Sequence, residues 1–225
     1  MTPPKEPPLR AADTVYVTLR SRILRNQLSG GSQLLEDAIA ADLGLSRTPV
    51  REALARLESE GLVEPIPRHG YRVIPITMED IREIYQVLSP LETVAAELLA
   101  QKKPNSAEVK ALQETVDKMA AALKADDLDA WADADEMFHA RLVDFCGNRR
   151  LAKVAHLLFA QSHRVRLFTL HLRDKPLSSV ANHGALVDAI RKGRPDLARQ
   201  IHAGQRDNWT VTMAQLLERL KIHQL

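Results

Sequence analysis

The chain has 225 residues, of which 45% are hydrophobic, 27% charged and only 4% aromatic, and its formal net charge is +2. This composition excludes a disordered chain and favours packed helices over a β-sandwich, and the near balance of charge means that any nucleic-acid binding must come from the placement of charges. The single cysteine, Cys146, excludes an intrachain disulfide and a CxxC zinc site.

No apolar run is long enough to span a bilayer, and no apolar signal segment opens the chain. We therefore expect a cytoplasmic protein with no membrane partner.

The first 45 residues predict an arm followed by two helices. Residues 1–11 are rich in proline and have no periodic pattern, which indicates a disordered arm. Asp13 is the expected cap of a helix that ends at Gly30, and its apolar residues recur about once per turn at Tyr16, Leu19, Ile23 and Leu28. A short second helix runs through Ile39 and is expected to end at Gly44.

The stretch LGLSRTPVREALARLESEGL, residues 43–62, predicts the third helix. Ser46 is the expected N-cap, and one face of the helix is apolar, with Val50, Leu54 and Leu57. This leaves Arg47, Thr48 and Arg51 together on the opposite side. Two arginines and a hydroxyl in the first turns of a rigid helix suit the base edges and phosphates of a DNA major groove.

A β-hairpin is predicted next. Val63 and Ile66 precede the turn Arg68-His69-Gly70, and Tyr71 and Val73 follow it. Three helices and a hairpin in this order predict a winged helix-turn-helix domain over residues 12–75.

Residues 78–225 have a helical pattern almost throughout, with breaks that divide them into about six helices and no candidate strand. Pro90 is expected to kink the first of these helices or to mark its true start. The predicted fold class is therefore mainly α, with an N-terminal winged helix-turn-helix and a C-terminal antiparallel all-helical bundle.

Asp135 and His139 lie four residues apart in DADEMFHARL, so they share one helix face and can share a metal ion. The alternative is a pair of buried polar residues bonded to each other, which in an unfamiliar helical bundle is the simpler interpretation.

At this point the sequence closely resembles the GntR family of bacterial transcription regulators, in the stretches LSRTPVREALARLESEGLV and PRHGYRV. The helical remainder is similar to the FCD effector domain of the FadR subgroup, nearer its VanR-like branch because six helices are expected. The resemblance covers roughly residues 12–215. It implies DNA contacts from Arg47, Thr48 and Arg51, beside Ser46, and a wing tip at His69-Gly70, beside Arg68, that enters the minor groove.

One residue of the second helix departs from the best-known member of the subgroup. Asp37 stands where that member has a DNA-contacting arginine. The operator sequence therefore cannot be carried over.

The resemblance also implies a divalent metal, held by one Asp and three His. Asp135, His139 and His183 match the first three of these ligands, and Gln205 takes the place of the last histidine. His202, three residues earlier on the same helix face, is a candidate substitute. Zinc, nickel or manganese is the expected ion, and an amide at Gln205 is expected to weaken its binding.

Arg164, Arg166 and Asn182 are the candidate effector contacts, because an arginine that faces the bundle interior can pair with a carboxylate ligand. Exposed arginines on a helix surface are the alternative. The sequence has Leu88 where many FCD domains carry an arginine, so one usual effector anchor is missing.

Together these features predict a homodimeric transcriptional repressor that binds a palindromic operator on double-stranded DNA, with a C-terminal domain for dimerisation and effector binding. A small metabolite, expected to be a carboxylate, is expected to control its DNA affinity. The alternative is a metal-dependent hydrolase fused to a DNA-binding module, with zinc on Asp135, His139 and His183. That alternative lacks a general base, because Glu136 points about 100° away from Asp135 on the helix. We therefore expect no enzymatic activity.

Overall fold

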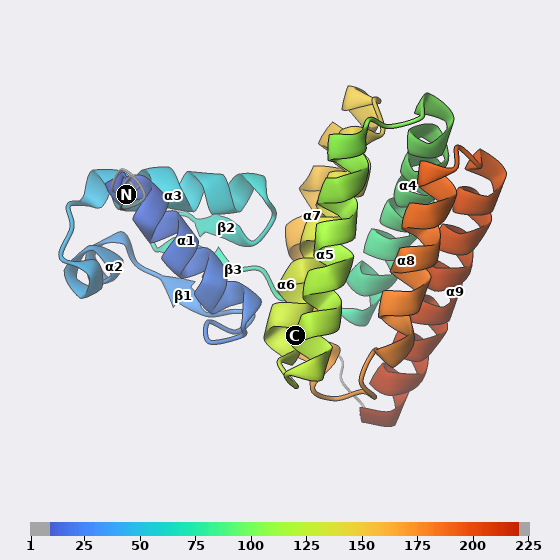
Figure 1. Cartoon of the computed structure of the whole chain (residues 1–225). Helices are drawn as coiled ribbons and strands as arrows, with labels where there is room; N and C mark the ends of the chain where they lie inside the picture. Colours follow the sequence, from blue (N-terminus) through green and yellow to red (C-terminus); the bar gives the residue numbers. More distant parts are fainter. Residues whose placement is uncertain (1–9, 221–225) are drawn as a thin grey trace. The chain divides into compact units, whose positions relative to one another are not determined.

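The computed structural model describes residues 10–220, and the chain divides into two compact units, Met1–Pro75 and Ile76–Leu225 (Figure 1). Residues 1–9, which hold most of the predicted arm, lie outside the described residues, as do residues 221–225. Within the described part of the chain, every helix is too short or too polar to cross a membrane.

The first unit contains three helices, α1 (Ala11–Leu24), α2 (Glu36–Leu43) and α3 (Arg47–Ser59). α1 packs against α3, and the apolar stripes of these two helices are fully buried at Val15, Leu19, Ile23, Val50, Leu54 and Leu57. Gly44 has a left-handed φ of +65° and ends α2, as predicted.

The predicted bounds of the first helix were wrong at both ends. α1 begins at Ala11, so Asp13 lies within its first turn, where it pairs with Arg10 and Arg56 and does not cap the helix. The helix ends at Leu24, because Asn26 takes a left-handed φ of +55°. Leu28 continues the apolar spacing of the helix only by chance. The predicted helix was therefore too long at its C-terminal end.

The predicted hairpin is present as β2 (Val63–Ile66) and β3 (Gly70–Val73), which pair antiparallel with Val63 opposite Val73. A third strand that was not predicted, β1 (Gln33–Leu34), pairs with the other edge of β3, so the sheet order is β1-β3-β2. Two residues are too few to show the alternation of a strand, and β1 exists only because β3 lies beside it.

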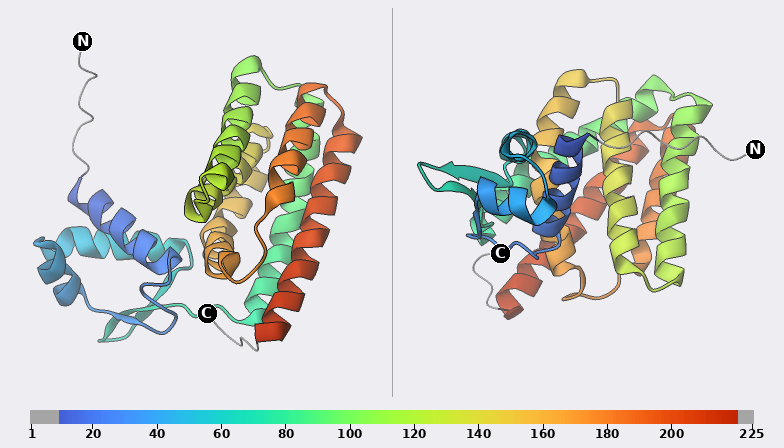
Figure 2. Two further views of the ribbon diagram at one scale, coloured as in Figure 1. Left: turned by 60° about the horizontal axis from the view of Figure 1, so that its bottom comes forward. Right: turned by 90° about the vertical axis from the view of Figure 1, so that its left-hand side faces the viewer.

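The second unit contains six helices within the described residues, as predicted: α4 (Met78–Lys102), α5 (Ser106–Lys124), α6 (Leu128–Phe145), α7 (Arg149–Leu170), α8 (Leu177–Arg191) and α9 (Pro195–Leu220). α4 is central and packs against α6, α7, α8 and α9. The views in Figure 2 show α4, α8 and α9 lying lengthwise beside one another.

Pro90 lies in the interior of α4 and does not mark its start. The helix begins at Met78, where Thr77 and Asp80 form a capping box. The alternative start at Pro90 was therefore wrong.

Polar residues interrupt the buried stripes of this bundle. Leu88, Leu99 and Phe138 are fully buried, as expected for helix-helix packing, but nine charged or imidazole side chains of the described residues are buried as well: Glu92, Asp135, His139, His163, Arg164, Arg166, His183, His202 and Arg206. A buried charge is costly unless it is paired, so the partners of these side chains define the site.

Candidate functional site

The predicted DNA-contacting residues of α3 lie at its exposed N-terminal end. Arg47, Thr48 and Arg51 are exposed, and Ser46 occupies the N-cap position. Ser46 is therefore the N-cap residue, as predicted, but its side chain makes no capping hydrogen bond.

Both arginines at this end are paired with carboxylates of α2. Arg51 donates from Nε to Glu36 Oε1 at 3.1 Å and from Nη2 to Glu36 Oε2 at 2.8 Å. Arg47 Nε lies 3.0 Å from Asp37 Oδ1. The hydrogen bond from Arg51 lowers the pKa of the Glu36 carboxyl, so Glu36 is ionised. Glu36 thus orients Arg51, and Asp37 pairs with Arg47.

The wing tip is shaped from within the unit. Arg68 and His69 are exposed, and Gln33 Nε2 donates to the His69 carbonyl at 2.9 Å. Gly70 has a φ of +78°, and a Cβ atom there would lie 2.5 Å from the Leu34 carbonyl oxygen. Close approach of β1 therefore requires this glycine, a reason that the sequence did not reveal.

In the second unit, the structure brings together the three predicted ligands Asp135, His139 and His183, all of them buried. Asp135 Oδ1 lies 3.4 Å from His183 Nε2 and 3.7 Å from His139 Nε2. One ligand atom from each residue lies within 4.8 Å of the other two. The i, i+4 spacing on α6 places two of these ligands, and α8 supplies the third.

Each of these three side chains is held by a different partner at its other polar atom. Asp135 Oδ2 pairs with Arg166 Nη1, and His183 Nδ1 donates to the Ser179 carbonyl at 2.7 Å. His139 Nδ1 lies 3.1 Å from Glu92 Oε1. Outer partners of this kind fix the orientation of metal ligands, because they leave the remaining atom of each ligand directed at the ion.

The charge states in this cluster favour a cation. Burial lowers the pKa of His183 to about 4, so this imidazole is neutral near pH 7. Its Nδ1 carries the proton given to Ser179, so its Nε2 presents a lone pair. Burial raises the pKa of Asp135, but Arg166 and the two histidines outweigh that effect and leave the pKa well below its usual value. A lone pair and an ionised oxygen thus face each other, and these residues fit a divalent metal.

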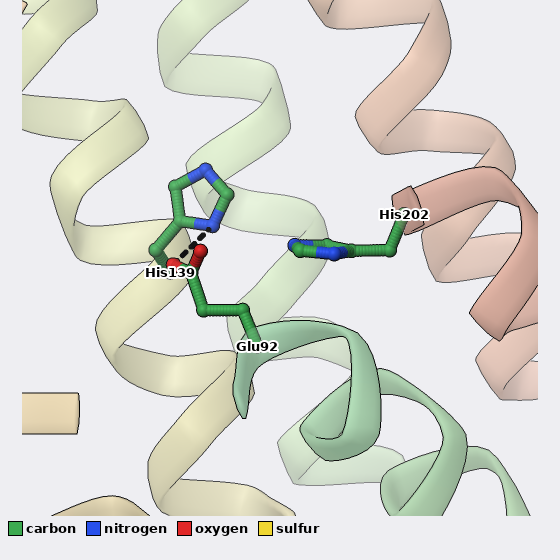
Figure 3. Close-up of side chains that lie close together, drawn as sticks. All are labelled: Glu92, His139 and His202. Atoms are coloured by element: carbon green, nitrogen blue, oxygen red, sulfur yellow. Dashed lines mark ion pairs between the residues drawn. The ribbon is translucent and has the colours of Figure 1, made fainter. Parts of the chain in front are cut away.

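His202 lies in a second group, with Glu92 and with the same His139 (Figure 3). His202 Nδ1 lies 2.9 Å from Thr93 Oγ1. The expected substitution of His202 for the missing fourth ligand therefore does not follow from the geometry, because this histidine is grouped with Glu92 and not with Asp135 and His183. Positions 202 and 205 are nearly one helical turn apart along α9, so a histidine at 202 does not occupy the place of a ligand at 205.

The Glu92 group already contains a cation, Arg206. Its Nη2 pairs with Glu92 Oε2 and lies 3.0 Å and 3.3 Å from the two ring nitrogens of His139, which places it above the ring. Burial alone would raise the pKa of Glu92, but Arg206 and His139 lower it by more than burial raises it. The pKa therefore lies below its usual value, and this carboxyl is ionised. The guanidinium compensates the charge of Glu92, and we assign this group to the support of His139.

A cavity of about 800 Å³ opens beside the Asp135 group. Arg166, Asn182 and Gln205 line it, as does each member of that group. Arg164 does not line this cavity, although it is only 1% exposed. Two residues along α7 correspond to about 200° of rotation, so Arg164 and Arg166 cannot face the same cavity. Arg164 therefore lies outside this cavity, and its role as an effector contact stays a prediction.

Sequence reasoning missed Glu92 and Arg206 as members of the site. Glu92 interrupts the buried stripe that contains Leu88 and Leu99, and a carboxylate in such a stripe is a signal that could have been read. Arg206 follows His202 by four residues and so shares its helix face.

The geometry gives no support to the hydrolase alternative. Glu136, the neighbour of Asp135 in sequence, pairs with His163 at 3.3 Å. It is therefore engaged away from the Asp135 group, where a general base would be needed.

Comparison with known proteins gives two family matches. Residues 11–73 match the family described as bacterial regulatory proteins, gntR family, and residues 83–204 match the FCD domain. A gluconate operon transcriptional repressor from Bacillus licheniformis is 34% identical over 201 residues, which cover 86% of this chain and 82% of the relative. An uncharacterized HTH-type transcriptional regulator in the TAR-I ttuE-ttuC' intergenic region of Agrobacterium vitis is 45% identical over 130 residues, 57% of this chain and 76% of the relative.

Solved structures have the same fold. E. coli McbR/YncC superposes with a TM-score of 0.78 at 20% sequence identity. The match covers 95% of this chain and 100% of the McbR/YncC chain. A putative transcriptional regulator GntR from Rhodococcus sp. RHA1 has a TM-score of 0.75 at 23% identity, over 92% of this chain and 97% of its own.

Proposed function

Because this chain belongs to the GntR family of bacterial transcription regulators and carries an FCD domain, we propose that it is a repressor controlled by a divalent metal and a small carboxylate. The relatives are named as transcription regulators and not as enzymes, and this chain is a regulator as well. The Asp135 group beside the 800 Å³ cavity is the observation that carries the proposal.

The first unit reads the operator. Ser46, Arg47, Thr48 and Arg51 meet the major groove, and the wing residues Arg68, His69 and Gly70 follow the minor groove. Two copies of the chain bind as a homodimer, so that two identical units match the halves of a palindrome. Since its target is chromosomal DNA, the protein acts in the bacterial cytoplasm.

Asp135, His139 and His183 would hold the metal, with zinc, nickel and manganese as candidates. When bound, the ion supplies positive charge for an anionic ligand. Glu92, Arg166 and the Ser179 carbonyl hold the three ligands in place. Gln205 lines the same cavity and offers an amide to the ligand or to the ion.

A small carboxylate is the ligand class that the chemistry favours. Arg166 and Asn182 line the cavity beside the metal ligands, and both donate hydrogen bonds. Two relatives are named as repressors of a gluconate operon, and gluconate is a hydroxylated carboxylate. A compound of this class fits a cavity with donors and a metal.

Ligand and DNA are coupled through the preferred arrangement of the two winged units in the dimer. If the ligand binds best when these units are badly spaced for the operator, it lowers DNA affinity by the same factor by which DNA lowers ligand affinity.

The test uses the purified full chain and fluorescently labelled DNA from upstream of its own gene. Anisotropy is measured with and without a panel of carboxylates, D-gluconate and citrate included, after metal analysis of the same sample. We expect saturable binding that at least one carboxylate weakens while light scattering still reports a dimer. Operator affinity that no member of the panel changes would refute the proposed control.

A further inference from the structure

The cavity contains a third arginine to which neither the metal site nor the DNA interface assigns a role. Arg173 lies in the segment between α7 and α8 and lines the cavity together with Arg166 and Arg206. Those two arginines pair with Asp135 and Glu92, respectively. Among the described side chains, no carboxylate forms an ion pair with Arg173, which distinguishes it from the other two.

The unpaired atoms of Arg173 are the ones that recognise carboxylates. Its Nε and Nη2 atoms are buried and have no hydrogen-bond acceptor among the described residues. These two atoms form one edge of the guanidinium and donate two parallel hydrogen bonds to a carboxylate. Arg51 uses the same edge to hold Glu36. In Arg173 this edge has no partner within the described chain.

Two tryptophans flank this guanidinium. Its carbon Cζ lies 4.5 Å from the ring centroid of Trp209 and 5.8 Å from that of Trp131. Both indole Nε1 atoms are buried and, within the described residues, have no acceptor. The rings fix the guanidinium through cation–π contacts, and their N–H groups add two donors to the two of Arg173.

Four donor atoms that meet no acceptor among the described residues suit an anion that accepts several hydrogen bonds. Leaving buried donors unpaired is costly, so a site of this kind is retained where a ligand satisfies it. Burial lowers the pKa of Arg173 to about 10, and the side chain still carries its positive charge near pH 7. A carboxylate supplies one negative charge and up to four acceptor positions.

We infer that Arg173, Trp131 and Trp209 form a subsite for a carboxylate group of the ligand, distinct from the metal ligands Asp135, His139 and His183. The inference rests on the proposed function and deepens it. The ligand carries its carboxylate to Arg173 and presents hydroxyl or second carboxylate oxygens to the metal side of the cavity.

The test uses tryptophan fluorescence, because Trp131 and Trp209 are the two tryptophans of the chain and both report on this subsite. The full chain is titrated with D-gluconate, citrate and sulfate, and with sorbitol as an uncharged analogue, in metal-free and zinc-loaded forms. We expect a saturable change with a carboxylate and none with sorbitol. Calorimetry measures the same affinities independently of the indole signal.

Arg173→Gln is expected to weaken carboxylate binding about 10- to 100-fold, because two hydrogen bonds to a charged group are lost. Arg173→Lys is expected to retain part of the affinity, since it keeps the charge but not the planar edge. Arg199→Gln is the matched control, because Arg199 is an exposed arginine of α9 paired with Glu97, and it should bind like wild type.

Unchanged affinity in both Arg173 variants would overturn the inference, and so would sulfate binding as tightly as the carboxylates or the absence of any carboxylate response in wild type. Circular dichroism checks that each variant is folded, and Arg173→Lys serves if the glutamine variant is not. If a carboxylate still releases the operator from Arg173→Gln at its wild-type concentration, the subsite fails while the proposed function stands. If it releases the operator from no protein, the proposed function itself fails.

Discussion

Arg51 in the winged unit and Arg173 in the helical unit offer the same edge, Nε and Nη2, to different surroundings. Arg51 is exposed and holds a carboxylate of its own chain, Glu36. The corresponding edge of Arg173 is buried against tryptophans and, within the described residues, meets no acceptor. The exposed arginine has a partner that water or DNA can replace, whereas the buried one has no carboxylate partner among the described residues.

The two units therefore use charge differently. In the first unit the side chains of Arg47 and Arg51 are more than half exposed in their ion pairs, so other anions can compete for these arginines. In the second unit the pairs Asp135–Arg166 and Glu92–Arg206 are buried and hold the site together.

The largest effect is expected from breaking a buried pair. Glu92→Ala removes the carboxylate of the buried Glu92–Arg206 ion pair and should lower the free energy of unfolding by about 3–5 kcal/mol. Glu97→Ala, on the same helix, removes the partner of the exposed Arg199 and should cost about 0–1 kcal/mol. Urea unfolding followed by circular dichroism measures both. Equal losses in the two variants would erase the distinction between buried and exposed pairs.

The next effect concerns metal binding. His183→Ala removes a proposed ligand and should weaken zinc binding by at least about 100-fold, the upper end of what the loss of an outer partner alone costs. His202→Ala is the matched control, since His202 lies in the Glu92 group, and it should retain the metal. Elemental analysis and chelator competition give the affinities. A full equivalent of tightly held metal in His183→Ala would remove this histidine from the site.

The third effect concerns operator binding by the first unit. Arg51→Ala is expected to weaken operator binding about 10- to 100-fold if this arginine reads a base. Metal content and thermal stability should stay at wild-type values, because Arg51 is exposed and lies in the other unit. Anisotropy titrations on the operator and on a scrambled duplex provide the measurement. An unchanged operator affinity would eliminate the role of Arg51.

The smallest effect is expected at the partner of that arginine. Glu36→Gln removes a negative charge beside Arg47 and Arg51 and should strengthen binding to scrambled DNA by about threefold, the range of one exposed ion pair. Operator binding should gain less, because Arg51 loses its orientation, so the ratio of specific to nonspecific affinity falls. Titrations at several salt concentrations separate the nonspecific, salt-dependent binding from the operator-specific binding. A rise in this ratio would contradict a positioning role for Glu36.

Local patterns explain how much of the fold could be predicted from the sequence. The stripe Val50, Leu54 and Leu57 and the left-handed Gly44 located α3, and the breaks between helices predicted the six-helix bundle. β1 could not be predicted, because its two residues become a strand only where β3 offers an edge. The end of α1 was misplaced for a related reason, since periodicity does not report where the backbone turns at Asn26.

The candidate site was predictable only where its residues lie near one another in sequence or match a known family. The spacing of Asp135 and His139 predicted a shared helix face, and His183 came from the resemblance. Glu92 and Arg206 come from helices far apart in the chain, so only packing reveals that they meet. Arg173 has no periodic pattern at all, because it lies between helices.

Gly70 has a further consequence for the wing. β1 pairs with β3 on one side and β2 pairs with it on the other, and the missing side chain at Gly70 lets the Leu34 carbonyl approach. β3 is thereby paired at both of its edges before any duplex is present. Little conformational entropy is then lost on association, so more of the contact energy of the wing is retained as affinity.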